Sequence, residues 1–188
     1  VELSYGVTDI QGELKVEGKV DSLNLDSITS YGGSQDKDQN QSINKKGNQL
    51  EISGNAWKKI DIGGYEITKD TILEFDFQST KETEISGIGF DNNNSINESN
   101  TLQLSGHQIW GIQKFKDYKI NSGWKTYKIK AGDYFQGKQQ YLTFTSDHDE
   151  GGQNGDSLFR NVRIYEKGKV DYLNLESITS YGGSQDKD

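Results

Sequence analysis

The segment TILEFDFQST, residues 71–80, alternates apolar and polar side chains with a period of two. One side of such a strand would carry Leu73, Phe75 and Phe77, and the other side would carry Glu74, Asp76 and Gln78. Successive side chains of a β-strand point to opposite faces, so this pattern is typical of a strand that buries one face only. The segment predicts a sheet packed on one side against a hydrophobic core.

Similar short runs extend through the rest of the chain. They lie at Gln49–Ser53, Ala56–Ile62, Glu84–Asp91, Thr101–Leu104, Trp124–Ile129, Tyr141–Thr145 and Leu158–Tyr165. Turn-forming clusters such as Gly63-Gly64 separate them, and no long stretch carries the apolar stripe of a helix. The sequence therefore predicts an all-β fold, a jelly-roll β-sandwich of about 8 to 10 antiparallel strands.

The composition narrows the classes of function. The chain has 188 residues, which suits one domain with extensions. It contains no cysteine, which excludes disulfides, a thiol nucleophile and zinc–thiolate sites. A formal net charge of -8 disfavours nucleic acid and an anionic membrane surface as partners. No run of about 18 apolar residues occurs, so we expect no membrane insertion.

One segment of 21 residues occurs twice. The sequence GKVDSLNLDSITSYGGSQDKD at Gly18–Asp38 returns as GKVDYLNLESITSYGGSQDKD at Gly168–Asp188, with differences only at positions 22/172 and 26/176. Because such a match is not accidental, we interpret the chain as one unit of a tandem array, with an artificial duplication as the alternative. The expected parts are residues 1–17, the end of a preceding domain or a linker; 18–167, the β-sandwich unit; and 168–188, the start of the next copy or a donated strand.

The second copy suggests a way for chains to associate. Its SITSY segment resembles a strand and would lack a domain of its own. A strand of this kind can add to the open sheet edge of a neighbouring chain through main-chain hydrogen bonds. Residues 168–188 are therefore a candidate route for self-association.

An acidic, glycine-rich segment, DHDEGGQNGD at residues 147–156, lies between two predicted strands. Calcium binds six to eight oxygen ligands, and glycines allow backbone carbonyls to join the carboxylates. The segment and two further acidic clusters predict a structural Ca²⁺ site, with a solvated acidic turn as the alternative. The candidate ligands are Asp147, Asp149, Asn154, Asp156, Asp36, Asp38 and Asp91.

Sugar recognition needs flat apolar faces together with planar polar groups. The segment GHQIWG, residues 106–111, offers both, with Trp110 as the stacking platform and His107 and Gln108 beside it. Further stacking candidates are Trp57, Trp124 and Tyr118, although a core role for these tryptophans is the more common one. These six residues are the predicted ligand-binding set.

One strand offers a hydrolase as an alternative to a binding module. Glu74-Phe75-Asp76-Phe77-Gln78 is similar to the Glu-x-Asp-x-Glu strand of the retaining jelly-roll glucanases, in which same-face carboxylates serve as nucleophile and acid/base. Gln78 occupies the place of the second glutamate and cannot deliver a proton. A solvent-facing polar stripe explains the pattern equally well, so the sequence predicts that the chain is not an enzyme.

The middle of the chain resembles the calcium-associated carbohydrate-binding modules of secreted bacterial polysaccharidases and large surface proteins. The resemblance is carried, in order, by SITSYGGSQD, GNAWKKI, TILEFDFQST, ISGIGFD, HQIWGI, GWKTYKI, YLTFTSDHD and FRNVRIYE, within residues 27–166. It implies a jelly-roll sandwich, structural calcium, polysaccharide as the partner, no catalysis and a secreted, extracellular or cell-surface location. The alternative is a structural repeat of an adhesin stalk or extracellular filament, joined by strand exchange between units.

Overall fold

A computed structural model describes residues 21–23, 25–37, 43–46, 48–149 and 154–167 of the chain. Within these ranges the strands are β1 Asp21–Ser22, β2 Thr29–Ser30, β3 Ile43–Lys46, β4 Gln49–Ser53, β5 Ala56–Ile67, β6 Thr71–Gln78, β7 Ile85–Asp91, β8 Thr101–Ser105, β9 Lys125–Lys130, β10 Gly137–Asp147 and β11 Asp156–Glu166. Short 3₁₀ turns lie at η1 Leu25–Ser27, η2 Gly33–Gln35, η3 Glu98–Asn100, η4 Gln113–Phe115 and η5 Ala131–Asp133.

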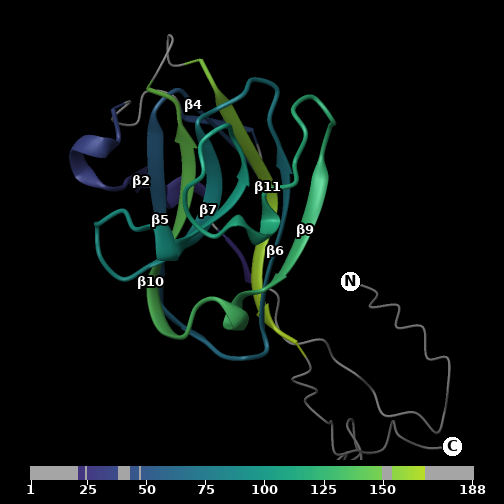
Figure 1. Ribbon diagram of the computed structural model, residues 1–188. Coiled ribbons are helices and arrows are strands. Elements are labelled where there is room, and N and C mark those ends of the chain that lie inside the picture. Colours follow the sequence, from purple (N-terminus) through teal and green to yellow (C-terminus); the bar gives the residue numbers. More distant parts are fainter. Residues whose placement is uncertain (1–20, 24, 38–42, 47, 150–153, 168–188) are drawn as a thin grey trace, which may run out of the picture.

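The strands form two antiparallel sheets that pack face to face (Figure 1). The six-stranded sheet has the order β3-β4-β11-β6-β9, and β1 also pairs with β11. The five-stranded sheet has the order β2-β5-β10-β7-β8. The predicted all-β sandwich is therefore confirmed, and each of the predicted runs falls within or overlaps a strand. None of the helical segments in the described part of the chain is long and apolar enough to cross a membrane.

Aromatic side chains join the two sheets in the core. Phe159 of β11 lies 5.2 Å from Phe77 of β6 and 5.1 Å from Phe144 of β10, measured between ring centroids. All three side chains are fully buried. Because burial of one such ring contributes about 1.5–3 kcal/mol, this cluster is a main source of the sandwich's stability. Phe75 and Phe77 face inward, as the period-two pattern predicted.

An irregularity in β11 changes which side chains reach the outer face of the six-stranded sheet. Arg160 pairs with Asp76 and Arg163 pairs with Glu74, so β11 carries one residue more than β6 between these points. Asn161 takes up the extra length in the left-handed region, at φ 53. Asparagine tolerates this conformation better than most residues, and such bulges re-aim side chains. The bulge therefore places Arg160, Asn161 and Arg163 near the two acidic residues of β6.

Candidate functional site

A pocket of about 420 Å³ opens beside the bulge of β11. Its walls are Leu23, Leu25, Asn48, Glu74, Phe75, Asp76, Thr126, Asn161, Val162 and Arg163. β4 pairs with β11 over residues 156–160 and β1 pairs with it at residues 163–164; between them Leu23 N donates a backbone hydrogen bond of 3.5 Å to Val162 O. The pocket thus lies beside the junction of these three strands, where polar side chains converge.

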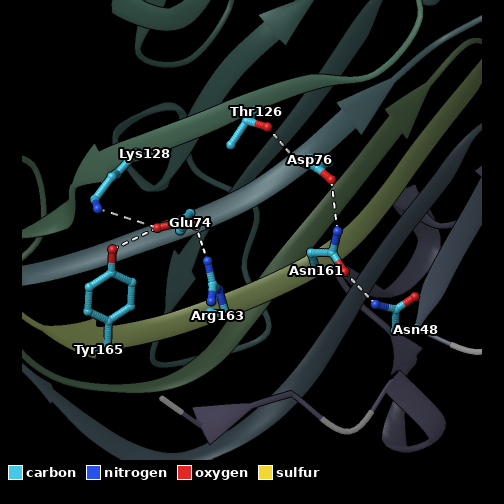
Figure 2. Close-up of polar contacts among 8 residues, drawn as sticks. All are labelled: Asn48, Glu74, Asp76, Thr126, Lys128, Asn161, Arg163 and Tyr165. Carbon is cyan, nitrogen blue, oxygen red and sulfur yellow. Dashed lines mark hydrogen bonds and ion pairs between the residues drawn. The ribbon is translucent and has the colours of Figure 1, made fainter. Parts of the chain in front are cut away.

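Glu74 stands at the centre of one polar group in this site (Figure 2). Tyr165 Oη donates a hydrogen bond of 2.7 Å to it, Arg163 pairs with it, and Lys128 Nζ lies 3.7 Å away. The hydrogen bond from Tyr165, helped by Arg163 and Lys128, outweighs burial and lowers the pKa of Glu74. The carboxyl group is therefore ionised at neutral pH.

Asp76, two residues further along β6, forms the second polar group. It accepts hydrogen bonds from Thr126 Oγ1 at 2.6 Å, Asn161 Nδ2 at 2.9 Å and Arg160 Nε at 3.0 Å. Burial alone would raise the pKa of Asp76, but these three donors outweigh it and the pKa is lowered. Asn161 Oδ1 in turn accepts from Asn48 Nδ2 at 2.5 Å, so the network reaches across the pocket (Figure 2).

An aromatic platform borders this network. The guanidinium of Arg160 lies 4.1 Å from the ring centroid of Trp124, which is half-buried. A cation held over an indole face is attracted by the ring quadrupole, so Arg160 fixes the orientation of the ring. Arg163 Nε lies buried with no hydrogen-bond acceptor among the described residues. The site therefore combines an indole, two guanidinium groups and two carboxylates.

The two carboxylates limit the chemistry of the pocket. Residues i and i+2 of a strand lie on one face, about 6.6 Å apart along the strand. Because the pKa values of Glu74 and Asp76 are both lowered, both groups accept hydrogen bonds or act as bases or nucleophiles, and neither is set up to donate a proton. Gln78 lies on the same strand, opposite Leu158, outside the pocket walls.

Sequence reasoning noticed Glu74 and Asp76 but interpreted them as a solvent-facing stripe. It missed Asn161, Arg163 and Tyr165, which come from β11 and lie about ninety positions away in the chain. The signal that could have found them is the FRNVRIYE strand, where two arginines and an asparagine interrupt the expected alternation. Only the register between β6 and β11 shows that the two groups meet.

The predicted HQIWGI sugar site lies on the other sheet. Trp110 packs edge-on against Trp57 of β5, with 5.4 Å between ring centroids. Trp57 is only 4% exposed, and its Nε1 donates to Asp147. Gln108 Nε2 donates to Glu84 Oε1 at 2.7 Å, and the exposed His107 lies 3.9 Å from the same carboxylate. These four predicted residues are thus brought together, but much of their polar surface contacts the protein itself.

Tyr118 and Trp124 lie away from that cluster. The Tyr118 ring is 7% exposed and packs against Phe77, while its hydroxyl donates to Gly123 O at 2.8 Å. The expectation that Tyr118 offers an open stacking face is therefore corrected, because the turn that follows folds the ring into the core. Trp124 is not among the pocket walls and lies beside Arg160, which is bonded to Asp76 of the pocket.

The predicted calcium ligands are not gathered around one point. Asp36 pairs with Lys58, Asp91 accepts from Tyr31 and Asn100, and Asp156 accepts from the Thr80 and Lys81 backbone. Asn154 is exposed, and Asp38 lies outside the described residues. No group of three or more His, Asp or Glu side chains in the described part of the chain could hold a metal ion. The described residues therefore do not fit one ion, and calcium binding stays a prediction.

Asp147, a predicted ligand, has a raised pKa. Burial raises the pKa of Asp147 to about 6; a hydrogen bond from Trp57 opposes this rise, and the charges of Asp149 and Glu84 add to it. The chain thus keeps negative groups close together at the end of β10, at a cost in stability near neutral pH.

No protein-family model matches this chain, and no curated protein does either. A similar solved structure is that of a "Putative glycosyl hydrolase from Parabacteroides distasonis ATCC 8503", with 13% identity and a TM-score of 0.49 over 79% of this chain and 99% of that chain. This finding overturns the expectation that the chain is not an enzyme, and the exclusion is corrected. At this identity the likeness assigns neither an activity nor a residue role to this chain. The resemblance to calcium-associated carbohydrate-binding modules stays a prediction.

Proposed function

We propose that the pocket on the six-stranded sheet binds carbohydrate. Glu74 and Asp76 accept hydrogen bonds from sugar hydroxyls, Asn161 and Arg163 donate them, and Trp124 offers an apolar edge to the C–H side of a ring. The observation that carries the proposal is the convergence of Glu74, Asp76, Asn161 and Arg163 on one pocket of about 420 Å³. Trp124 lies outside the pocket walls, beside Arg160. This volume falls in the usual range for small-molecule sites, roughly 300–1,000 Å³.

The balance of charges favours a hydroxyl-rich ligand over a polyanion. Among the residues that line the pocket, Glu74 and Asp76 are acidic and Arg163 is basic, so the pocket walls have no net excess of positive charge. Phosphate backbones are held by unopposed lysine and arginine side chains, whereas hydroxyl groups need donors and acceptors side by side. The chain's net charge of -8 adds to the repulsion of a polyanion.

The proposal extends to the setting of the site. The repeated 21-residue segment supports a parent protein with several such units, and linked weak sites bind a polymer more tightly than one alone. A secreted or cell-surface protein that holds polysaccharide would use its units in this way.

The experiment compares two tryptophan variants on opposite sheets. A glycan array identifies a binding sugar, and isothermal titration then measures its affinity for the intact chain, Trp124→Ala and Trp110→Ala. The proposal expects Trp124→Ala to lose at least about tenfold in affinity, the equivalent of 1.4 kcal/mol, while Trp110→Ala binds as the parent does. Unchanged affinity in Trp124→Ala, with a loss in Trp110→Ala, would place binding at the HQIWGI segment instead.

A further inference from the structure

Residues 21–37, called the strap below, connect the two sheets. β1 of the strap pairs with β11 in the six-stranded sheet, and β2 pairs with β5 in the five-stranded sheet. Between them Leu25 and Ile28, 6% and 8% exposed, belong to the hydrophobic core. The strap therefore completes a core that the body of the sandwich, residues 43–167, does not complete alone.

A buried ion pair fixes the C-terminal end of the strap. Lys58 Nζ lies 2.7 and 2.9 Å from the two carboxylate oxygens of Asp36, and both side chains are 0% exposed. Asp36 also accepts from the backbone nitrogen of Trp57 at 3.2 Å and from Ser30. Removing one partner of a buried ion pair leaves an uncompensated charge, which is strongly destabilising. The body thus binds an acidic group of the strap through Lys58.

Tyr31 and Gly32 fix the middle of the strap. Tyr31 Oη donates to Asp91 Oδ2 at 2.9 Å and to Ser95 O at 3.1 Å, and its ring is 1% exposed. Gly32 has φ 76, and a Cβ there would meet Ile96 Cδ1 at 2.3 Å, so a glycine is needed at this position. The strap is therefore recognised through a specific set of side chains.

The second copy of the segment carries the same set. An offset of 150 places Leu175, Ile178, Tyr181, Gly182 and Asp186 at the positions of Leu25, Ile28, Tyr31, Gly32 and Asp36. The two positions that differ between the copies, 22/172 and 26/176, are not among these five pairs. The chain therefore contains two segments that carry the same residues for binding to the body.

We propose that the surface formed by Trp57, Lys58, Asp91 and Ser95, called the seat below, is a binding site for the C-terminal copy of the strap. Residues 175–187 occupy the seat in place of residues 25–37, with Asp186 on Lys58 and Tyr181 on Asp91. The exchange is non-covalent, and the second copy carries the same residue types at the five positions by which the first copy is held. It would let one unit of a tandem array, or a neighbouring chain, be completed by the strap of another, as in strand donation.

A double-mutant cycle on the full chain tests the proposal. Asp36→Ala disables the first copy, Asp186→Ala disables the second, and the double variant disables both. Since an intact copy takes the seat in each single variant, each should lower Tm by no more than about 2 °C. The double variant should lower Tm by roughly 10 °C, because it removes from both copies the carboxylate that forms the buried ion pair with Lys58. Ser34→Ala and Ser184→Ala are matched controls, since Ser34 is exposed.

A different pattern of melting temperatures would contradict the proposal. If the C-terminal copy never enters the seat, Asp36→Ala alone gives the full loss and Asp186→Ala has no effect in either background. That additive pattern overturns the proposal.

A disulfide trap gives a second readout that does not depend on stability. Thr29 pairs with Lys59 across β2 and β5, and the chain contains no cysteine of its own. Thr29→Cys with Lys59→Cys should therefore form a disulfide under oxidation, and the proposal expects the same of Thr179→Cys with Lys59→Cys. Ser184→Cys with Lys59→Cys should not form one. The product mass shows whether the trapped copy comes from the same chain or another, and either one supports the proposal. Trapping by Thr29→Cys but not by Thr179→Cys overturns it.

Discussion

The outer faces of the two sheets differ although their strands share one sequence pattern. In β9 of the six-stranded sheet only Tyr127 and Ile129 are buried, and the polar side chains between them stay open. In β7 and β8 of the five-stranded sheet every residue is buried, because the chain that follows β8 folds back over them. Alternation therefore tells which face meets the core, but it does not tell whether the other face is free to bind a ligand.

Glycines make the covered face possible. A Cβ on Gly89 of β7 would stand 1.8 Å from the carbonyl oxygen of Asn100, so only glycine allows the neighbouring backbone to come this close. The glycines of the ISGIGF segment thus allow close backbone packing on the five-stranded sheet. On the six-stranded sheet, the polar side chains of β9 stay at least partly exposed.

The largest expected effect is a loss of stability on the covered face, that of the five-stranded sheet. Trp57→Ala removes a ring that is 4% exposed and contacts Trp110 and Tyr31. Because truncation of a buried aromatic leaves a cavity, we expect a loss of about 3–5 kcal/mol in the free energy of unfolding, measured by urea denaturation. A loss below about 1 kcal/mol would mean that the face is not closed.

Its counterpart on the open face is Trp124→Ala. The ring is half-buried and held by Arg160, so its removal should cost less than about 1 kcal/mol of stability while affinity for the glycan falls at least tenfold. Denaturation and titration of the same preparation check both values. A severe loss of stability with unchanged binding would reverse the roles of the two tryptophans.

A smaller effect concerns the pH dependence of stability. Burial raises the pKa of Asp147 to about 6 from 3.8, so the folded state holds a proton that the unfolded chain has lost, and stability falls as pH rises between these values. Asp147→Asn keeps an oxygen for Trp57 Nε1 but cannot ionise. After allowance for solvent screening, we expect the variant to be about 1 kcal/mol more stable at pH 7.

Thermal melts across pH 3 to 8 check this prediction. The stabilities of Asp147→Asn and the parent should converge below about pH 4, where the carboxyl group is protonated in both states. A variant that is less stable than the parent at pH 7 would show that the charge of Asp147 is needed, as a bound cation would require.

The smallest effect is expected from chelation. Asp36, Asp91 and Asp156 already accept hydrogen bonds from the protein, so EDTA should shift Tm by less than about 1 °C. A melt with and without EDTA, repeated with added Ca²⁺, measures this. A fall of several degrees that Ca²⁺ restores would establish the ion that the acidic segment predicts.

The sequence predicted the strands well because each is decided locally. The run that contains Phe75 and Phe77 needs only its own alternation to be recognised as a strand with one buried face. The site depends on pairing between distant segments, since Glu74 meets Arg163 only through the register of β6 and β11. Tyr118 shows the same limit. The sequence predicts it as a stacking residue, but its ring packs against Phe77 and is buried.

The most direct test maps where a glycan binds on the intact, ¹⁵N-labelled chain. Amide chemical shifts are recorded by NMR during titration with the sugar selected on the array. The account predicts that the largest changes fall on Thr126, Asn161 and Arg163, around the pocket of the six-stranded sheet. Changes centred on Gln103 and Trp110, with none at those three residues, would contradict it.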